Sequence, residues 1–326
     1  MIATRPLVTV AALRHQAEAD LRRQGIPTPR LDAEVLLAAT LGVSRAGLYA
    51  RLRDAVDESV DAAYRVAIER RGRREPVAYI TGTKEFCSLS FAVTPAVLVP
   101  RPETEDLVER VRQLLQHHPS PLICDVGTGS GCIAVAVARF LPRATLVAVD
   151  VSAAALQVAH VNASLHGVPE RVLLMASDLL TGVAAGTRFD LIVSNPPYLK
   201  PGDAVSPEVD WEPSAALVSG GDGLIAIRRL LASAPAYLHD DGTLVMEFGD
   251  GQSSAVLELA AAAGFQSLAI ERDLGGNPRV LIARAKSEKT KRTNRQVAKR
   301  SRDSGNDSES VIPAPAGIHP EDTETL

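Results

Sequence analysis

The sequence has few cysteines and no long apolar run. Only three of its 326 residues are cysteine (Cys87, Cys124, Cys132), and no two form a C-x-x-C pair, which favours reduced thiols over disulfides or a zinc site. The seven histidines show no metal-ligand spacing and no G-x-S-x-G motif occurs, so we expect no metal site and no serine nucleophile of that type. No apolar run approaches the roughly 20 residues that a spanning helix needs. We therefore expect a cytoplasmic protein that does not insert into a membrane.

A strong excess of charge is also missing. The formal net charge is -4, so no global positive field favours docking along a phosphate backbone. Nucleic acid is therefore not the expected partner. Because 46% of the residues are hydrophobic, a chain of this length can bury a large core and is expected to fold into roughly two domains.

The first part of the chain has helical periodicity. Leu13, Ala17 and Leu21 share one face of a helix that begins near Thr9 and ends at Gly25. Further helices are expected across residues 31–37, after residue 44, and from residue 57 towards residue 71. We predict a helical bundle domain over residues 1–75.

The pattern changes after residue 75. The short apolar runs 77–80 and 89–93 are predicted to be extended, because Gly82 separates them and Pro95 ends the second. Residues 76–102 are therefore predicted to form a β-hairpin linker between two domains.

From residue 103 onward, predicted helices and strands alternate. Strands are expected at 122–126, 145–149, 172–175, 189–194 and 243–248, with helices between them and two more strands at the end. This series predicts an α/β fold, a doubly wound, Rossmann-like parallel sheet, over residues 103–285.

The last segment, residues 286–326, has almost no apolar periodicity, and we expect it to be disordered. Its first half is basic, and the simplest interpretation is a solvated tail; contact with RNA or the ribosome is the alternative, and the only direct nucleic-acid contact expected. The basic residues are Lys289, Lys291, Arg292, Arg295, Lys299, Arg300 and Arg302.

A glycine-rich loop follows the strand predicted at residues 122–126. It contains Gly127, Gly129 and Gly131, with Thr128 and Ser130 between them, and an alanine-rich helix follows at once. Glycines let a ligand lie against bare main chain, while the helix N-terminus offers N–H groups to a carboxylate. Dinucleotide-binding loops have the spacing G-x-G-x-x-G, whereas this loop has G-x-G-x-G. The spacing favours S-adenosylmethionine over NAD as the cofactor of residues 127–131.

Acidic residues follow the next two predicted strands. The carboxylate of Asp150 can accept hydrogen bonds from both hydroxyls of a ribose. Asp178 could accept one from the adenine amino group, although an aspartate in that place is often a turn or helix cap. With the glycine loop, these residues predict an adenosine-binding site.

The strand predicted at residues 189–194 runs into Asn195-Pro196-Pro197-Tyr198. Ligands of a doubly wound sheet bind beyond the carboxyl ends of its strands at the switch point, which would place this loop beside the glycines. An amide nitrogen has a delocalised lone pair, and the Asn195 side-chain oxygen and the Pro196 carbonyl can accept its two N–H bonds. Pro197 favours an extended Pro196, and Tyr198 offers an aromatic face. The loop predicts methylation of a planar amide or amino nitrogen, with Asn195, Pro196 and Tyr198 as catalytic residues.

Together with three further segments, these motifs resemble the release-factor glutamine methyltransferases, the HemK/PrmC family. The segments are Val99-Pro-Arg-Pro-Glu-Thr-Glu105, Glu212-Pro213 with Ala216-Leu217, and Gly220 to Leu224. The first is the most restrictive, since Asn-Pro-Pro-Tyr also occurs in DNA adenine and some ribosomal RNA methyltransferases. The resemblance implies a class I methyltransferase fold whose seven-stranded sheet has an antiparallel last strand. It also implies that the helical domain recognises a class I peptide-chain release factor, and that the enzyme methylates the N5 nitrogen of the glutamine in that factor's Gly-Gly-Gln loop.

The resemblance also implies roles for single residues. Residues 127–131, Asp150 and Asn195 would contact the cofactor, and residues 195–198 would hold the glutamine. Leu179 stands where some relatives have an aromatic residue beside the adenine. Arg101 and Glu103 would order the loop between the domains near the substrate, the alternative being a local ion pair or a helix cap.

Three other functions remain open from the sequence. A nucleic-acid amino methyltransferase would need a basic groove or a base-recognition domain. A methyltransferase for a glutamine of a ribosomal protein could have the same active site. A sensor that binds S-adenosylmethionine without turnover would not need the residues that hold the glutamine.

Overall fold

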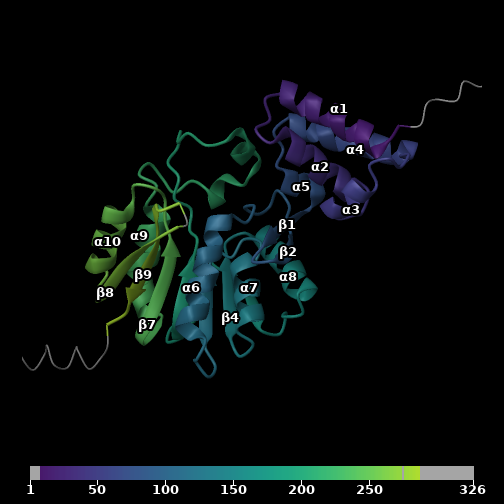
Figure 1. Cartoon of the computed structure of the whole chain (residues 1–326). Helices are drawn as coiled ribbons and strands as arrows, with labels where there is room; N and C mark the ends of the chain where they lie inside the picture. Colours follow the sequence, from purple (N-terminus) through teal and green to yellow (C-terminus); the bar gives the residue numbers. More distant parts are fainter. Residues whose placement is uncertain (1–7, 274, 287–326) are drawn as a thin grey trace, which may run out of the picture. The chain divides into compact units, whose positions relative to one another are not determined.

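Four helices form the N-terminal part of the chain in the computed structural model, which describes residues 8–273 and 275–286. They are α1 (Val10–Arg23), α2 (Pro29–Thr40), α3 (Arg45–Ala50) and α4 (Glu58–Gly72). Helix α1 begins at Val10 because the Thr9 side chain accepts a hydrogen bond from the Ala12 amide, as an N-cap residue does. Leu13, Ala17 and Leu21 are buried, as their spacing predicts. Figure 1 shows these helices packed against one another.

A fifth helix corrects the sequence prediction. Residues 77–80 were predicted to be extended, but Val77–Thr81 is the short helix α5. Val77 and Ile80 pack on the core of the helical domain, while Ala78 and Tyr79 pack in a second cluster with Val97. A short run that is apolar on both sides does not distinguish a strand from a helix, so the packing on two sides decides the outcome.

The second strand of the hairpin lies where it was predicted, whereas the first strand lies a few residues later than predicted. Strand β1 (Thr83–Phe86) pairs with β2 (Leu89–Ala92) in antiparallel register. Of β1 only Phe86 is buried, so this strand carries almost no apolar signal in the sequence. The Asn162 side chain pairs with both the amide and the carbonyl of Ala92, which fixes the hairpin to helix α8 (Ala153–Leu165).

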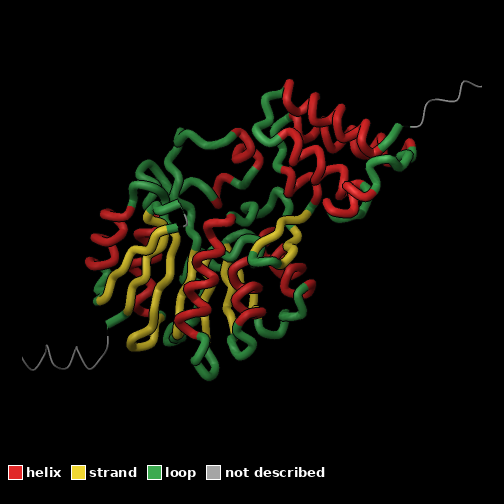
Figure 2. Tube along the Cα trace, viewed as in Figure 1, coloured by secondary structure: helices red, strands yellow, loops and turns green. Residues whose placement is uncertain are grey.

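The remaining strands form one seven-stranded sheet in the order β5-β4-β3-β6-β7-β9-β8, and Figure 2 shows it flanked by helices. The strands are β3 (Leu122–Val126), β4 (Thr145–Asp150), β5 (Val172–Ala176), β6 (Phe189–Ser194), β7 (Leu238–Glu247), β8 (Ser267–Arg272) and β9 (Pro278–Arg284). Strand β9 runs antiparallel to both neighbours, and the other paired strands from β5 to β7 are parallel. The predicted doubly wound sheet with an antiparallel last strand is confirmed.

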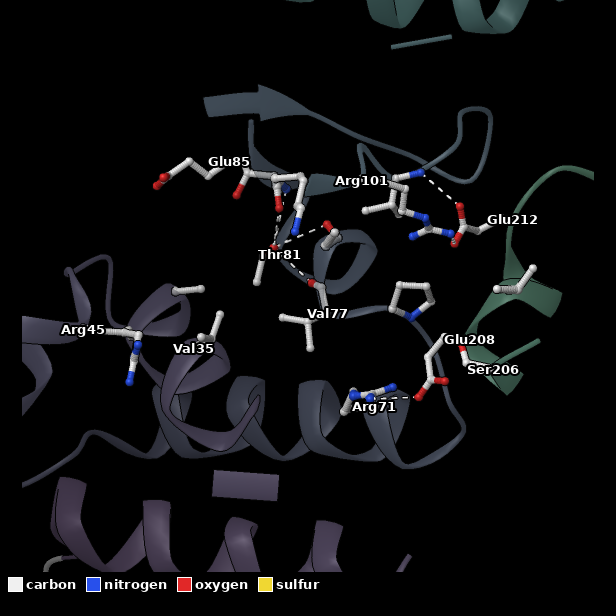
Figure 3. Close-up of a pocket in the computed structure, with 18 of the residues that line it drawn as sticks. Val35, Arg45, Arg71, Val77, Thr81, Glu85, Arg101, Ser206, Glu208 and Glu212 are labelled. Carbon is white, nitrogen blue, oxygen red and sulfur yellow. Dashed lines mark hydrogen bonds and ion pairs between the residues drawn. The ribbon is translucent and has the colours of Figure 1, made fainter. Parts of the chain in front are cut away.

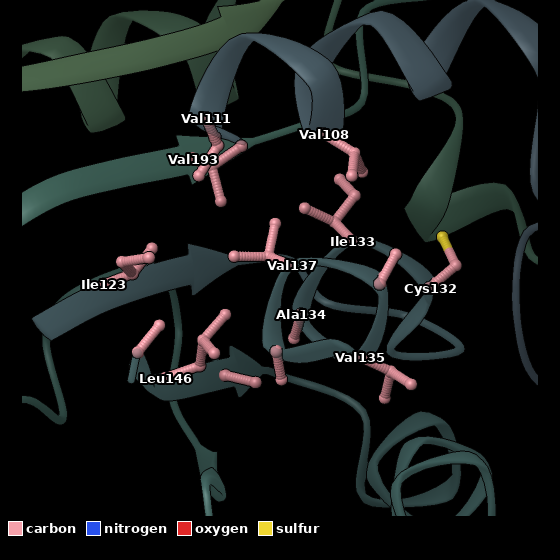
Figure 4. Packing of buried hydrophobic residues seen from close by; sticks show 14 of the residues in the cluster. Val108, Val111, Ile123, Cys132, Ile133, Ala134, Val135, Val137, Leu146 and Val193 are labelled. Atoms are coloured by element: carbon pink, nitrogen blue, oxygen red, sulfur yellow. The ribbon is translucent and has the colours of Figure 1, made fainter. Parts of the chain in front are cut away.

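Helices cover both faces of the sheet. Helices α6 (Glu105–Leu115) and α7 (Cys132–Phe140) pack on one face, where Val108, Ile133 and Val193 meet (Figure 4). Helices α9 (Ile225–Ser233) and α10 (Ser253–Ala262) pack on the other face, in a cluster with Ile192 and Met246. Because successive residues of a strand point to opposite faces, β6 contributes to both cores.

The segment predicted to be disordered and basic in its first half, residues 286–326, lies outside the described residues except for Lys286. Within residues 8–273 and 275–286, no helix is long and apolar enough to cross a membrane.

Candidate functional site

The site lies where the chain reverses its direction of travel across the sheet. From β3 the strands proceed outward through β4 to β5, and the chain then returns to place β6 on the other side of β3. Val126 at the end of β3 pairs with Ser194 at the end of β6, and the Ser194 hydroxyl donates to the Val126 carbonyl at 2.7 Å. The next residues, Gly127 and Asn195, therefore leave the sheet side by side, at the switch point where such folds bind ligands.

The glycine loop presents bare main chain. Gly127 (φ +75°) and Gly129 (φ +55°) have left-handed conformations, and a Cβ atom built on either would meet no atom within 4 Å. Gly131 (φ +78°) differs, because its Cβ would lie 3.0 Å from the Cβ of Ala159 in helix α8. The first two glycines thus leave open space where a ligand could lie, and the third allows the loop to approach a helix closely.

Asp150 at the end of β4 braces this loop. One carboxylate oxygen accepts the Gly129 amide at 2.8 Å and the other accepts the Ser152 amide at 2.8 Å. An ionised carboxylate has about four acceptor positions, so both oxygens keep room for hydroxyl donors from a ligand.

The side chains between the glycines face the protein interior. The Thr128 hydroxyl donates to Asp125 at 2.6 Å, and Asp125 also accepts the Ala134 amide at 3.2 Å. Asp125 is fully buried, and this burial raises the pKa of its carboxyl to about 7 against the opposing effect of both hydrogen bonds. Ser130 is 2% exposed. Thr128 and Ser130 therefore shape the loop through its backbone and its underside.

Six of the nine residues predicted to bind the cofactor line one cavity of about 340 Å³: Gly127, Gly129, Asp150, Asp178, Leu179 and Asn195. This volume falls within the range of about 300 to 1,000 Å³ usual for small-molecule sites. The donors and acceptors are those an adenosyl group needs, with a carboxylate at one strand end and bare main chain at the next. The residues present therefore fit S-adenosylmethionine. Thr128, Ser130 and Gly131 are not among the residues that line this cavity.

An ion pair lines the donor cavity. Asp178 pairs with Arg229 of helix α9 at 2.8 Å, and both side chains are about half exposed. Leu179 has φ +53°, a conformation that is uncommon for a residue other than glycine, and its carbonyl accepts the Ser177 hydroxyl at 2.7 Å. Arg229 was not singled out from the sequence, because an arginine on a helix face usually only contacts solvent.

A second, smaller cavity of about 170 Å³ adjoins the first. Asn195, Pro196, Pro197 and Tyr198 line it, together with Arg101 and apolar residues that include Leu98 and Leu217. Leu98, Asn195, Pro197 and Ala216 line both cavities. The predicted donor and acceptor motifs therefore border two adjoining spaces.

A buried network holds two of the acceptor residues. Asn195 Nδ2 donates to the Thr104 hydroxyl oxygen at 3.0 Å, and the Thr104 hydroxyl donates to Glu247 Oε2 at 2.8 Å. The other oxygen of Glu247 accepts the Tyr198 hydroxyl at 3.2 Å. Burial raises the pKa of the Tyr198 hydroxyl, and the nearby Glu247 carboxylate raises it further, so this hydroxyl keeps its proton.

A wide groove of about 1040 Å³ leads to the acceptor cavity, sharing Arg101, Val205 and Val209 with it (Figure 3). Helices of the N-terminal domain form one side of the groove, and the segment between β6 and α9 forms another. Arg71 of α4 is 5% exposed and pairs with Asp32 at 2.7 Å and with Glu208 at 2.9 Å. Burial alone would raise the pKa of Glu208, but hydrogen bonds, including one from Arg71, lower it below its usual value.

Arg101 and Glu103 have different surroundings. Arg101 donates to Glu212 at 2.5 Å, and Glu212 also accepts the Val99 amide at 3.0 Å, so an ion pair joins two distant segments. Glu103 is exposed and is not among the residues lining the three cavities. The neighbouring Thr104, which sequence reasoning passed over, reaches the site instead.

Residues 12–82 match the model of the PrmC N-terminal domain, and residues 107–252 match that of the methyltransferase small domain. A release factor glutamine methyltransferase of Geobacter sulfurreducens is 43% identical over 267 residues, covering 81% of this chain and 92% of the relative. A protein of the same name from Rhodopirellula baltica is 40% identical over 268 residues, covering 80% and 90%.

Solved structures show the fold alone. The hMettl16 catalytic domain, solved in complex with the MAT2A 3'UTR hairpin 6, aligns with a TM-score of 0.50 at 15% identity, covering 71% of this chain and 82% of that one.

Proposed function

The chain belongs to the release factor glutamine methyltransferase family, and we propose that its acceptor is the N5 amide nitrogen of the glutamine in the Gly-Gly-Gln loop of class I release factors. It is an S-adenosylmethionine-dependent enzyme that methylates a release factor glutamine. The observation that supports the proposed site most directly is the pair of adjoining cavities that share Asn195 and Pro197.

Each cavity suits one partner of the reaction. S-adenosylmethionine, when bound, supplies an electrophilic methyl group. In the donor cavity the Asp150 carboxylate is placed to accept ribose hydroxyls, and Gly127 and Gly129 leave main chain free to contact the ligand. We assign the donor cavity to the cofactor and the acceptor cavity to the glutamine side chain.

Orientation is the main contribution of the acceptor residues. The Asn195 Oδ1 atom and the Pro196 carbonyl would accept the two N–H bonds of the glutamine amide and turn its nitrogen towards the donor cavity. The Tyr198 ring would stack on the planar amide. Such alignment needs reacting atoms about 3 to 3.5 Å apart.

The reaction needs no strong base at the nitrogen. The nitrogen would take the methyl carbon as the C–S bond of the sulfonium breaks and a neutral thioether leaves, and the methylated nitrogen, now acidic, would release its proton to water. The described residues agree with this, since Asn195, Pro196 and Tyr198 offer only hydrogen bonds, and Glu247 is 1% exposed behind them.

The groove is the proposed path for the protein substrate. A loop with two glycines before its glutamine lacks side chains at those two positions and would extend from the groove into the acceptor cavity past Arg101 and Val205, which line both. The groove is lined by charges of both signs, Arg45 and Lys84 as well as Glu85 and Glu208, which suits a protein surface better than a phosphate backbone. We propose that the helical domain provides the recognition surface, and that the reaction occurs in the cytoplasm, where release factors act.

Labelling of purified components tests the proposal. The protein is incubated with methyl-labelled S-adenosylmethionine and purified release factors, ribosomal proteins or RNA, and the label is mapped by mass spectrometry. We expect label on the Gly-Gly-Gln glutamine. Label on a ribosomal protein or on RNA alone would contradict the assignment of the acceptor.

The variant Asn195→Ala separates transfer from cofactor binding. We expect it to abolish transfer while changing the Kd for the cofactor by less than about tenfold, because one lost hydrogen bond costs roughly 0.5 to 1.5 kcal/mol. Calorimetric titration of the cofactor provides the control. Normal turnover in this variant would remove Asn195 from the mechanism.

A further inference from the structure

The hydrogen bonds of the buried network behind the acceptor cavity all run in one direction, from Asn195 through Thr104 to Glu247. Ser194 at the end of β6 pairs with Met246 of β7, so the next residues, Asn195 and Glu247, lie at the same end of neighbouring strands. Thr104 comes from the turn before α6 and lies between their side chains. Glu247 and Thr104 are 1% and 3% exposed, so the hydrogen bond between them is shielded from water.

We propose that Glu247, acting through Thr104, fixes the rotation of the Asn195 amide so that its oxygen faces the acceptor and donor cavities. Glu247 and Thr104 are then positioning residues, because neither touches the reacting groups. This inference rests on the proposed function, since it explains how the acceptor for the glutamine N–H bond is oriented.

The argument follows from the number of protons available. When Glu247 is ionised its carboxylate can only accept, so the single hydroxyl proton of Thr104 is then committed to Glu247 at 2.8 Å. The Thr104 oxygen can then only accept from Asn195, which must turn its NH2 group towards it, at 3.0 Å. The opposite side of the amide is Oδ1, which has no partner among the residues that the structure describes.

A reversed amide would defeat the site. With Oδ1 turned towards Thr104, Asn195 would present two N–H donors to a glutamine NH2 group, which is also a donor. The same carboxylate accepts the Tyr198 hydroxyl at 3.2 Å, so both polar side chains of the acceptor motif are held by Glu247. A charged residue at the end of an apolar strand thereby acquires a role that the sequence alone did not indicate.

The direct test is the variant Thr104→Val, which keeps the shape of the side chain and removes the hydroxyl. We expect kcat with release factor to fall by about tenfold or more, while the KM for S-adenosylmethionine changes by less than about twofold. Thr104→Ser restores the hydroxyl and should recover most of the lost rate. Thr243→Val is the matched control, because Thr243 is 7% exposed on the same strand β7 and lies outside the network.

A spectroscopic measurement separates orientation from general packing. The chain has five asparagines, so selective ¹⁵N-asparagine labelling yields five side-chain amide signals, and Asn195→Ala identifies the one from Asn195. Its NH2 protons should exchange slowly with water in the wild type and in Thr104→Ser. In Thr104→Val they should exchange at least about tenfold faster, because their acceptor is lost.

Each result decides the inference. Unchanged kcat in Thr104→Val, or a lower kcat with an unchanged Asn195 amide signal, would overturn it. A failure of the proposed function is recognised separately, because the wild-type enzyme would then leave the release factor unlabelled while the amide measurement still reports on the network.

Discussion

Two glycines of the loop after β3 should respond differently to the same substitution. Gly129 and Gly131 both have positive φ, so alanine costs about 1 to 2 kcal/mol of backbone strain at either position. The added Cβ meets nothing within 4 Å at Gly129, but lies 3.0 Å from the Cβ and 3.2 Å from the Cα of Ala159 at Gly131. Overpacking of this kind adds about 1 to 3 kcal/mol. We therefore expect Gly131→Ala to lower the free energy of unfolding by about 2 to 5 kcal/mol, and Gly129→Ala by only about 1 to 2 kcal/mol.

Gly129→Ala should weaken cofactor binding more than Gly131→Ala does, which is the reverse of their effects on stability. The Cβ of Gly129→Ala enters the space that the donor cavity reserves for a ligand against bare main chain, so the Kd for S-adenosylmethionine should rise by at least about tenfold, or 1.4 kcal/mol. Urea denaturation measures the stability of both variants, and calorimetric titration measures binding.

The double variant Gly131→Ala with Ala159→Gly isolates the close contact. If the clash is with Ala159, removing that methyl group should recover about 1 to 3 kcal/mol beyond the sum of the single changes. Zero coupling, or equal losses of stability in the two glycine variants, would refute the packing argument. Wild-type affinity in Gly129→Ala would refute the assignment of the donor cavity.

Three further predictions concern the acceptor, the buried glutamate and the buried ion pair. A Gly-Gly-Asn substrate should react about 5 to 150 times more slowly than Gly-Gly-Gln, since one methylene moves the nitrogen by an amount worth about 1 to 3 kcal/mol; equal rates by mass spectrometry would contradict a shaped cavity. Burial raises the pKa of Glu247 to about 7, against the hydrogen bonds from Thr104 and Tyr198 and the attraction of Arg279, while Glu103 raises it slightly. The folded protein therefore retains a proton that the unfolded chain has released, and the stability contributed by this group falls as pH rises from about 4.5 to about 7. Glu247→Gln should lose this slope, so its unfolding free energy relative to the wild type should increase between pH 5 and pH 8 by an amount of order 1 kcal/mol per pKa unit; a constant difference would exclude the raised pKa. Arg71→Met should cost about 3 to 5 kcal/mol of unfolding free energy because Asp32 loses its buried partner. Arg65→Met, which breaks an exposed pair with Asp61, should cost only about 0.3 to 0.5 kcal/mol. Similar losses of stability in both variants would contradict the role of burial.

The sequence predicts those parts of the fold and of the candidate site that depend on local chemistry. The strand before Gly127 and the strand before Asn195 were each located from their apolar runs, and the switch-point rule brought them together. Periodicity also located helix α1, whose Leu13, Ala17 and Leu21 are buried, and helices α3 and α4 begin where they were expected, after Ser44 and Asp57.

Features that depend on packing between distant segments were not predictable in this way. Helix α5 is apolar towards two different cores, so its pattern resembles that of a buried strand. Thr104 is buried while Glu103 beside it is exposed, and the phase of a three-residue turn gives no signal for that difference. Glu247 appears in the sequence as a charged strand end, and only the pairing of β7 with both β6 and β9 encloses it.

The donor and acceptor cavities share only a few lining residues, so the residues that select the methyl donor differ largely from those that select the target. Strands β3, β4 and β5 end in the residues that surround the donor cavity, whereas the acceptor cavity is built by the end of β6 and the segment that follows it. Replacing residues 199–209, none of which lines the donor cavity, would therefore redirect the enzyme to another amide while the nucleotide half stays intact.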